Sequence, residues 1–335
     1  MKAIGIVSGG LDSLVAVRLV QRMGLEPLLV HFVTGFEPTH VRAQLADPLA
    51  AFQPPESAGQ LGAEIRVVDL RTPFLELLAA PRHGYGANMN PCIDCKILML
   101  SQANHLRVEQ NAPFVFSGEV IGQRPMSQRK DIMQLIARES EVCDRLVRPL
   151  CGTLLPETAP EREGVFSRAQ LESIQGRSRQ RQMELARELA IAHYPSPAGG
   201  CLLTDPGYSA RVRELMSRRE GRRLNLTDPP LLLVGRHIVL PGGAKAVIGR
   251  NAQENPVLER HGSLGVLLEA DGIPGPLTWV EGEPSASDLQ AAARLTARYG
   301  KGRGQAKVLI VVKAADGQIC QLDLPPGTPD GCRIL

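Results

Sequence analysis

The residues best suited to chemistry stand near the start of the chain, in the run Ser-Gly-Gly-Leu-Asp-Ser at positions 8–13. Gly9 and Gly10 let the main chain approach an anion without a Cβ in the way. Apolar residues before this turn predict a short strand over 2–7, and helical spacing after it predicts a helix over 14–20. Because the start of a helix presents free N–H groups and a partial positive charge, the run predicts a cradle for pyrophosphate.

Three side chains add to this cradle. Ser8 and Ser13 can donate hydroxyl hydrogen bonds to a phosphate, whereas Asp12 would repel one. The useful role for Asp12 is to hold a metal ion, Mg²⁺, that bridges phosphate oxygens. A pair of glycines after a strand is, without these side chains, more often structural than functional. The complete run therefore predicts binding of a nucleotide with Mg²⁺.

A second chemical signal is the pair Cys92 and Cys95. Asn90 suits a helix N-cap and Pro91 the first helical position, so both thiols are expected in the first turn of a helix. The helix dipole there favours thiolate over thiol, and the pair can share a metal ion or exchange sulfur. A zinc half-site and a thioredoxin-like redox pair are the alternatives. Zinc would need a second close cysteine pair, which the sequence lacks.

A third signal is Cys201, which follows two prolines and two glycines within residues 194–206. Such a composition predicts a tightly turned, exposed loop. A single cysteine is more often a small buried hydrophobe than a catalyst. Beside the nucleotide turn and the cysteine pair, Cys201 becomes a candidate for the same chemistry.

The elements that must position these residues alternate between strand and helix patterns. Further strands are predicted over 26–32, 63–69 and 112–118, with helical patterns between them. This alternation predicts an α/β fold with a doubly wound parallel sheet. Ligands of such sheets bind beyond the carboxyl ends of the strands. Residues that follow strand ends should therefore converge on the nucleotide beside positions 8–13, and these are Val33, Ser117 and Gly118.

The run at positions 8–13 resembles the PP-loop of the ATP pyrophosphatases, the adenine nucleotide alpha-hydrolases of HUP-like fold. It is neither a Walker A loop nor a Rossmann turn, because Gly-Lys-Ser/Thr and the G-x-G-x-x-G spacing are both missing. With Cys92 and Cys201, the resemblance narrows to the tRNA-thiolating members, the 2-thiouridylases and 4-thiouridine synthetases. It implies an enzyme that uses ATP to adenylate a uridine carbonyl oxygen of tRNA and then replaces that oxygen with sulfur.

The cysteines depart from one branch of this family, because 2-thiouridylases of the persulfide type often carry aspartate where this chain has Cys92. A cysteine pair together with one distant cysteine resembles the pattern of the cluster-dependent thiolases, in which three thiolates hold a [4Fe–4S] cluster. That resemblance implies Cys92, Cys95 and Cys201 as cluster ligands, with a persulfide relay as the alternative. It also implies a sulfur donor, which is a cysteine desulfurase, a relay protein or sulfide.

Basic residues suggest where RNA would lie. The net charge is only +3, but residues 177–223 hold ten arginines and five acidic residues, a balance of +5 that leaves −2 elsewhere. Arg177 and Arg179 in this segment, with Arg124 and Arg129 after the fourth strand, could contact RNA phosphates. A solvated helix face is the alternative for these side chains.

The last third of the sequence predicts a small α+β accessory domain. Residues 228–230 read as a linker, and residues 231–240 and 244–251 flank a turn as a hairpin. Strands are expected to pair at 307–312 and 319–322, and Lys301–Gly304 reads as a basic, flexible tip. Residues 248–255 resemble the NFACT-R module of RNA-binding proteins. The expected division is a PP-loop domain over 1–150, a basic segment completing it over 151–226, and the accessory domain over 231–335.

Composition limits the remaining choices. The sequence is 43% apolar and 22% charged, as in soluble globular proteins, and we expect a cytoplasmic location with no membrane partner. Seven cysteines with wide spacing argue against a disulfide framework. A PP-loop enzyme that activates a small molecule and a non-catalytic RNA- or ribosome-binding protein are the alternative functions. The sequence leaves the oligomeric state open, with a homodimer among the options.

Overall fold

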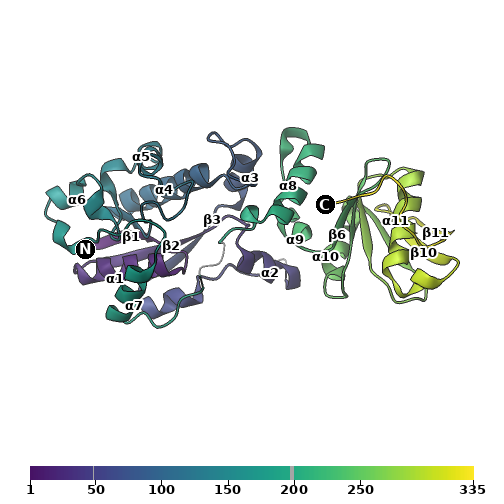
Figure 1. The fold of residues 1–335 in the computed structure, drawn as a ribbon, viewed down its shortest axis with the longest axis horizontal. Helices are drawn as coiled ribbons and strands as arrows, with labels where there is room; N and C mark the ends of the chain where they lie inside the picture. Colours follow the sequence, from purple (N-terminus) through teal and green to yellow (C-terminus); the bar gives the residue numbers. More distant parts are fainter. Residues whose placement is uncertain (48, 197–199) are drawn as a thin grey trace. The chain divides into compact units, whose positions relative to one another are not determined.

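The computed structural model describes residues 1–47, 49–196 and 200–335, which form two compact units (Figure 1). The first unit comprises Met1–His40, Ala51–Thr204 and Arg219–Leu226, and the second comprises Val41–Ala50, Asp205–Arg218 and Thr227–Leu335. Two of the turn residues predicted before Cys201, Pro197 and Gly199, lie outside the described residues.

The first unit contains a five-stranded sheet in the order β3-β2-β1-β4-β5, and every neighbouring pair is parallel. This arrangement confirms the predicted parallel α/β sheet. The short strand β5 was not predicted, because two residues are too few to show a hydrophobic period. The strands are β1 (Lys2–Ile6), β2 (Glu26–Val33), β3 (Ile65–Asp69), β4 (Val115–Ser117) and β5 (Leu146–Val147).

Helices cover both faces of this sheet, since successive side chains of a strand point to opposite faces. Ala3 of β1 packs into one core with α1 (Leu11–Arg22) and α7 (Gln180–Glu188). Ile4 packs into a second core with α4 (Cys92–Glu109) and α5 (Lys130–Glu139). The two helix pairs lie on opposite sides of the sheet in Figure 1. The remaining helices that begin in this unit are α2 (Pro38–Ala46), α3 (Arg71–Ala79) and α6 (Ala159–Arg162).

The second unit is built on a seven-stranded antiparallel sheet in the order β11-β10-β8-β9-β7-β6-β12. Helix α11 (Ala286–Tyr299) packs its buried face into the core of this sheet. The predicted hairpin is confirmed by β6 and β7, where Val239 is opposite Lys245. The strands are β6 (Arg236–Val239), β7 (Lys245–Ile248), β8 (Gly265–Ala270), β9 (Thr278–Glu281), β10 (Val308–Lys313), β11 (Ile319–Leu324) and β12 (Arg333–Ile334).

Three predictions about the second unit were wrong. Residues 228–230, predicted as a linker, form the first turn of α9 (Asp228–Leu233) and are buried. Proline is accepted there because the first N–H groups of a helix have no partner to lose. Residues 231–233, predicted as strand, continue this helix. Lys301–Gly304, predicted as a flexible tip, is a 3₁₀ helix after α11. The unit also contains α8 (Pro206–Arg218) and α10 (Asn255–Glu259).

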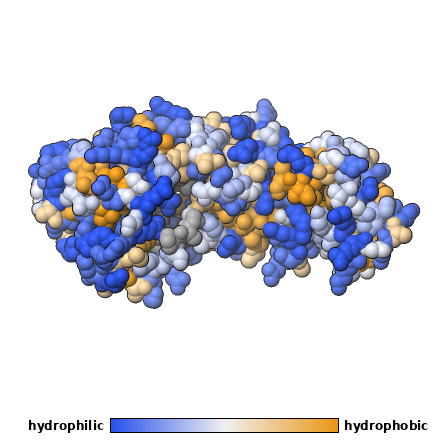
Figure 2. All heavy atoms as spheres, viewed as in Figure 1, coloured by the Kyte–Doolittle hydropathy of each residue, from blue (hydrophilic) through white to orange (hydrophobic). Residues whose placement is uncertain are grey.

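The surface visible in Figure 2 is mostly hydrophilic, with small apolar patches. Large apolar side chains that remain exposed include Val108 and Ile319. Among the described residues, no helix has both the length and the apolar character needed to cross a bilayer.

Candidate active site

The turn between β1 and α1 is closed by its own side chains. Ser13 Oγ donates to the carbonyl oxygen of Gly10 at 2.8 Å and lies 3.4 Å from both the N and Oγ atoms of Ser8. Gly9 has a φ of 77°, and a Cβ there would lie 2.5 Å from Cβ of Pro55, so only glycine fits. Within the described residues, the N–H groups of Leu11 and Asp12 have no hydrogen-bond acceptor. The turn therefore presents helix N-terminal donors with no partner of their own.

The loop after β4 packs directly on this turn. A Cβ on Gly118 would lie 2.5 Å from the carbonyl oxygen of Asp12 and 2.7 Å from the nitrogen of Ser13. Ser117 donates its hydroxyl to Oε2 of Glu119 at 3.1 Å rather than facing the turn. Val33, the last residue of β2, is fully buried. The structure thus brings Gly118 against residues 8–13, and it places Val33 and Ser117 at the same edge of the sheet.

Asp12 has one satisfied and one unsatisfied carboxylate oxygen. Its Oδ2 accepts a hydrogen bond from Nε2 of Gln123 at 2.6 Å and lies 3.8 Å from Nη2 of Arg179. Its Oδ1 is buried without any hydrogen-bond partner in the described part of the chain. Burial raises the pKa of Asp12 above its ordinary value, although Gln123 and Arg179 oppose the rise. A buried, unpaired carboxylate oxygen is a fitting ligand for a hard cation such as Mg²⁺.

The cysteine pair begins helix α4, but the predicted cap is wrong by one residue. The residue before the helix is Pro91, and Asn90 does not cap it. Asn90 instead uses its Nδ2 to donate to Sγ of Cys92 at 3.2 Å. Asn90, which was predicted to cap the helix, therefore contacts a thiol of the candidate site.

Two hydrogen bonds hold the Cys201 loop in place. The N–H of Leu202 donates to the carbonyl oxygen of Phe36 at 2.9 Å, just after β2. The side chain of Asn88 donates to the carbonyl oxygen of Thr204 at 2.8 Å, just before α4. Cys201 is thereby fixed between the end of β2 and the start of the helix that carries the other two cysteines.

Two of the three thiols, those of Cys95 and Cys201, have a raised pKa. Burial raises the pKa of Cys95 well above its ordinary value, and the nearby Cys201 and Cys92 raise it further. Burial also raises the pKa of Cys201 to about 12, although the backbone N–H of Leu203 opposes the rise. The predicted preference for thiolate is therefore wrong for Cys95, because desolvation outweighs the helix dipole. No three metal-ligating side chains among the described residues lie at metal-binding distances.

The nucleotide turn and the cysteines share one neighbouring cation. The positive charge of Arg124 opposes the rise in the pKa of both Asp12 and Cys201. The same loop supplies the contacts: Gln123 donates to Asp12, and Sδ of Met126 lies 4.0 Å from Nδ2 of Asn90, which contacts Cys92.

Sequence reasoning missed Glu37, which lies in the loop after β2. Its carboxylate accepts hydrogen bonds from Thr34 Oγ1 at 2.6 Å and from the nitrogens of Thr34 and Gly35 at 3.0 Å each. Burial acts to raise the pKa of Glu37, but hydrogen bonds from His40 and Thr34 outweigh it and hold the pKa below its ordinary value. The negative charge of Glu37 adds to the raised pKa of Cys95 and Cys201. Its place after a strand end was the signal that could have found it.

Glu119 is a second carboxylate near this edge. It is 2% exposed, accepts from Nε of Arg148 at 3.2 Å and lies 3.8 Å from Nζ of Lys96. Lys96 directly follows Cys95 and lowers the pKa of that thiol. The buried carboxylate thus holds a cation next to the cysteine pair.

The predicted RNA-binding arginines differ in their surroundings. Arg124, Arg129 and Arg177 are exposed, and Arg129 pairs with Asp131 at 2.7 Å. Arg179 is less exposed and lies beside Asp12. The basic segment 177–223 is divided between the two units, with Arg211, Arg213 and Arg218 in the second. The charge of +5 counted along this segment therefore does not belong to a single surface.

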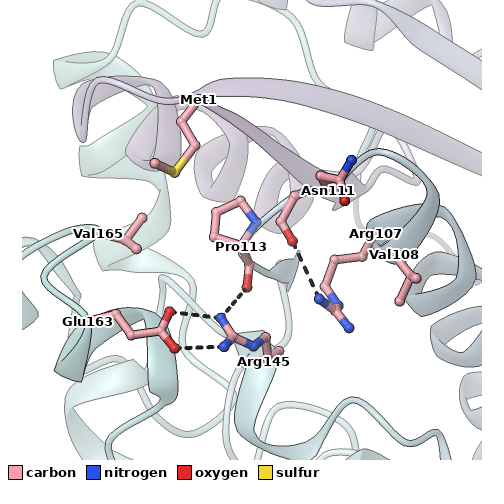
Figure 3. A pocket seen from close by; sticks show the side chains of 9 residues that line it. Met1, Arg107, Val108, Asn111, Pro113, Arg145, Glu163 and Val165 are labelled. Carbon is pink, nitrogen blue, oxygen red and sulfur yellow. Dashed lines mark hydrogen bonds and ion pairs between the residues drawn. The ribbon is translucent and has the colours of Figure 1, made fainter.

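The hollow in Figure 3 lies at the other edge of the sheet, at the amino ends of the strands. It has a volume of about 490 Å³ and is lined by Met1 before β1, Pro113 before β4 and Arg145 before β5. Arg145 donates to both carboxylate oxygens of Glu163, at 2.9 and 2.6 Å, and to the carbonyl oxygen of Pro113 at 3.1 Å. This hollow is separate from the candidate site, because parallel strands place their two ends at opposite edges.

An α/β domain that carries this glycine turn after its first strand is similar to the PP-loop nucleotide-binding domains. Residues 1–154 match the family model described as thiamine biosynthesis protein (ThiI), and residues 235–330 match the NFACT protein RNA binding domain. The first part of the chain is thus similar to ThiI and the last part to the NFACT RNA binding domain, which confirms both resemblances inferred from the sequence.

Curated relatives match part of the chain. A probable tRNA sulfurtransferase of Thermococcus kodakarensis is 24% identical over 151 residues, which is 45% of this chain and 37% of the relative. The tRNA-specific 2-thiouridylase MnmA of Syntrophomonas wolfei is 32% identical over 98 residues, 28% of this chain and 26% of the relative. The chain thus spans well under half the length of these relatives.

Solved structures show only distant likeness. A 4-thiouridine synthetase–RNA complex with bound ATP has a TM-score of 0.35 at 20% identity, covering 69% of this chain and 52% of that one. The C-terminal part of a fibronectin/fibrinogen-binding protein from Streptococcus suis has a TM-score of 0.26 at 12% identity, covering 70% and 87%. These TM-scores are too low to support an argument about fold or function.

Proposed function

We propose that this chain is an ATP-dependent tRNA sulfurtransferase, which adenylates a uridine carbonyl oxygen and replaces it with sulfur. The observation that carries the proposal is that one loop after β4 contacts Asp12 through Gln123 and contacts Asn90, the partner of Cys92, through Met126, within residues that match the ThiI family model. A protein that only bound nucleotide would have no need of three cysteines in the same domain as its phosphate turn.

The PP-loop would bind the triphosphate of ATP. The unpartnered N–H groups at the start of α1 and the hydroxyls of Ser8 and Ser13 supply donors, and Gly9 and Gly10 keep the approach open. The unpaired Oδ1 of Asp12 is suited to hold Mg²⁺. A bound Mg²⁺ would neutralise charge on the phosphates. Val33, Ser117 and Gly118, at the ends of β2 and β4, would complete the nucleotide pocket.

The reaction would proceed in two substitutions. The uridine oxygen attacks the α-phosphorus of ATP, and the bond from that phosphorus to pyrophosphate breaks with its electron pair leaving on pyrophosphate. A sulfur nucleophile at the oxidation level of sulfide then attacks the activated carbon. The carbon–oxygen bond breaks and AMP leaves with that electron pair, so no redox partner is required.

We propose Cys92, Cys95 and Cys201 as the ligands of a [4Fe–4S] cluster, although the three thiols are not gathered at metal-binding distances among the described residues. Cys92 adds to the raised pKa of both Cys95 and Cys201 because neighbouring thiolates would repel, and a cationic centre bound by the three thiols would relieve that repulsion. When bound, such a cluster would supply an iron that can bind sulfide. The alternative is a persulfide on Cys201 that Cys92 or Cys95 resolves by forming a disulfide.

The RNA would be held by two parts of the chain. The NFACT-type domain supplies one, because the family model that it matches is described as RNA binding. The exposed side chains of Arg124, Arg129 and Arg177 in the first unit would contact phosphates. Arg179 has a different environment, because it lies beside Asp12.

The proposal is tested by anaerobic incubation of the full chain with ATP, Mg²⁺, sulfide and unmodified tRNA. We expect AMP and a thiolated uridine in equal amounts, measured by chromatography and by mass spectrometry of the nucleosides. Binding of tRNA without AMP formation would favour the non-catalytic RNA-binding alternative. AMP formation that requires a small molecule rather than tRNA would favour the other alternative.

A further inference from the structure

We infer that Arg179 binds the β- and γ-phosphates of ATP and serves as the counter-ion of Asp12 while the nucleotide is absent. The inference rests on the proposed function, because it requires ATP in the PP-loop. It moves Arg179 from the predicted RNA-binding set to the nucleotide site.

The first observation is the position of the guanidinium. Nη2 of Arg179 lies 3.8 Å from Oδ2 of Asp12, and the side chain is 26% exposed. It makes no hydrogen bond within the described residues, so its donors are available to a ligand. Arg181, two residues on, differs in that all three of its guanidinium nitrogens donate to Glu172 or Glu188. Of these two arginines, the one with unused guanidinium donors is therefore Arg179, which lies beside the PP-loop.

The second observation is a chain of amide hydrogen bonds that holds α7 against the PP-loop. Gln182 on α7 is fully buried, and its Nε2 donates to Oε1 of Gln123 at 3.2 Å. Nε2 of Gln123 in turn donates to Oδ2 of Asp12 at 2.6 Å. Arg179 stands immediately before α7, so this chain fixes the distance between its backbone and the phosphate turn.

The same hydrogen bonds make Arg179 free to change partner. Oδ2 of Asp12 keeps its hydrogen bond from Gln123 whether or not the guanidinium is near. At 3.8 Å the contact between Arg179 and Asp12 is an ion pair without a hydrogen bond, which costs little to give up. A triphosphate in the turn offers several negative charges at short range, and a guanidinium can hold two phosphate oxygens at once.

The distribution of charge also favours a nucleotide over RNA as the ligand of Arg179. Asp12 lies at the N-terminal turn of α1, where the donors for an anion are found, and Arg179 is paired to that residue. Arg177, two residues earlier, is exposed and has no ion pair among the described residues, as expected of a side chain directed to solvent or RNA. A cation beside the PP-loop would stabilise the charge that develops on pyrophosphate as it leaves.

The experiment measures binding of ATP, AMP and pyrophosphate to the full chain in the presence of Mg²⁺, by calorimetry. Arg179→Ala is expected to weaken the affinity for ATP and for pyrophosphate by about tenfold or more and to leave AMP within about twofold. Arg179→Lys should recover part of the loss, since it restores charge but not the planar fork. Arg177→Ala is the matched control and should bind all three ligands as the natural chain does.

Each other outcome has one meaning. If Arg179→Ala binds ATP and pyrophosphate normally while its melting temperature is unchanged, the inference is wrong. If Arg179→Ala reduces the salt dependence of tRNA binding as Arg177→Ala does, Arg179 is an RNA-binding residue, as the sequence predicted. If Arg179→Ala unfolds, the pyrophosphate affinity of Arg179→Lys is the test. Normal pyrophosphate binding by Arg179→Lys would show that a guanidinium is not needed and would contradict the inference. If the natural chain binds neither ATP nor pyrophosphate, the proposed function itself fails.

Discussion

The backbone N–H of Leu202 donates to the carbonyl oxygen of Phe36 at 2.9 Å, and this bond fixes Cys201 beside the loop that follows β2. Glu37, the next residue after Phe36, acts electrostatically on both Cys201 and Cys95. The position of the third cysteine therefore depends on a contact between main-chain atoms. Side-chain substitutions at the cysteines should change the chemistry of the site without moving its loops.

The cluster assignment predicts the iron content of cysteine variants. Anaerobically purified protein should be brown and carry about four irons per chain, and each of Cys92→Ala, Cys95→Ala and Cys201→Ala should fall below about one. The exposed Cys143 and Cys320 provide matched controls, whose alanine variants should keep their iron. A colourless preparation that thiolates tRNA from a persulfide donor would contradict the cluster and favour the relay on Cys201.

The raised pKa of Cys201 predicts slow alkylation in cluster-free protein. Because only the thiolate reacts and the pKa of this thiol is about 12, its rate with iodoacetamide should rise about tenfold per pH unit from pH 7 to pH 10. Cys95 should behave in the same way, since burial raises its pKa as well. Peptide mass spectrometry at several times would measure both rates against the exposed Cys143. Alkylation of Cys201 as fast as Cys143 at pH 7 would show that the thiol is not buried in solution.

The nucleotide turn could be predicted from sequence because its determinants are local. The glycines, the strand before them and the helix after them occupy consecutive residues, and the structure places β1 and α1 there. The parallel sheet followed from alternating patterns, and only the two-residue strand β5 gave no pattern to read. Local signals were also misread at Asn90, whose side chain contacts Cys92 rather than the end of the helix.

The rest of the site depends on contacts that no spacing reveals. Gln123 and Gln182 reach Asp12 from distant parts of the chain, and neutral amides attract little attention as candidates. The charge count over 177–223 was misleading for a different reason. The chain leaves the first unit at Asp205 and returns at Arg219, so that neighbours in sequence are separated in the fold.

The carboxylate of Asp12, which the proposed function requires, should lower the free energy of unfolding at neutral pH. The pKa of Asp12 is raised on folding, so the folded chain binds the proton more tightly and the carboxylate opposes folding at neutral pH. Asp12→Asn should therefore abolish AMP formation while raising the melting temperature by about 2 °C at pH 7. The gain should shrink as pH falls through the raised pKa, where the natural residue also becomes neutral. Calorimetry at pH 7 and at about pH 4 would measure it, and a lower melting temperature at pH 7 would contradict the prediction.

The second unit contains a buried ion pair whose loss should be costly. Lys245 on β7 is fully buried, and its Nζ pairs with the carboxylate of Glu214, which also pairs with Arg218. Lys245→Met would leave that carboxylate desolvated, and we expect it to lower the free energy of unfolding by about 3 kcal/mol. Lys313 pairs with Glu269 at the surface of the same sheet, and Lys313→Met should cost less than about 0.5 kcal/mol.

The single tryptophan makes this measurement specific to the second unit. Trp279 on β9 is 1% exposed in that unit, so its fluorescence during urea unfolding reports the antiparallel sheet and not the PP-loop domain. The double variant Lys245→Met with Glu214→Leu should recover most of the lost stability, because it removes the carboxylate along with the cation. If Lys245→Met unfolded at the same urea concentration as Lys313→Met, the carboxylate of Glu214 would have to be hydrated or held by Arg218 in solution, and the pair would not be a buried one.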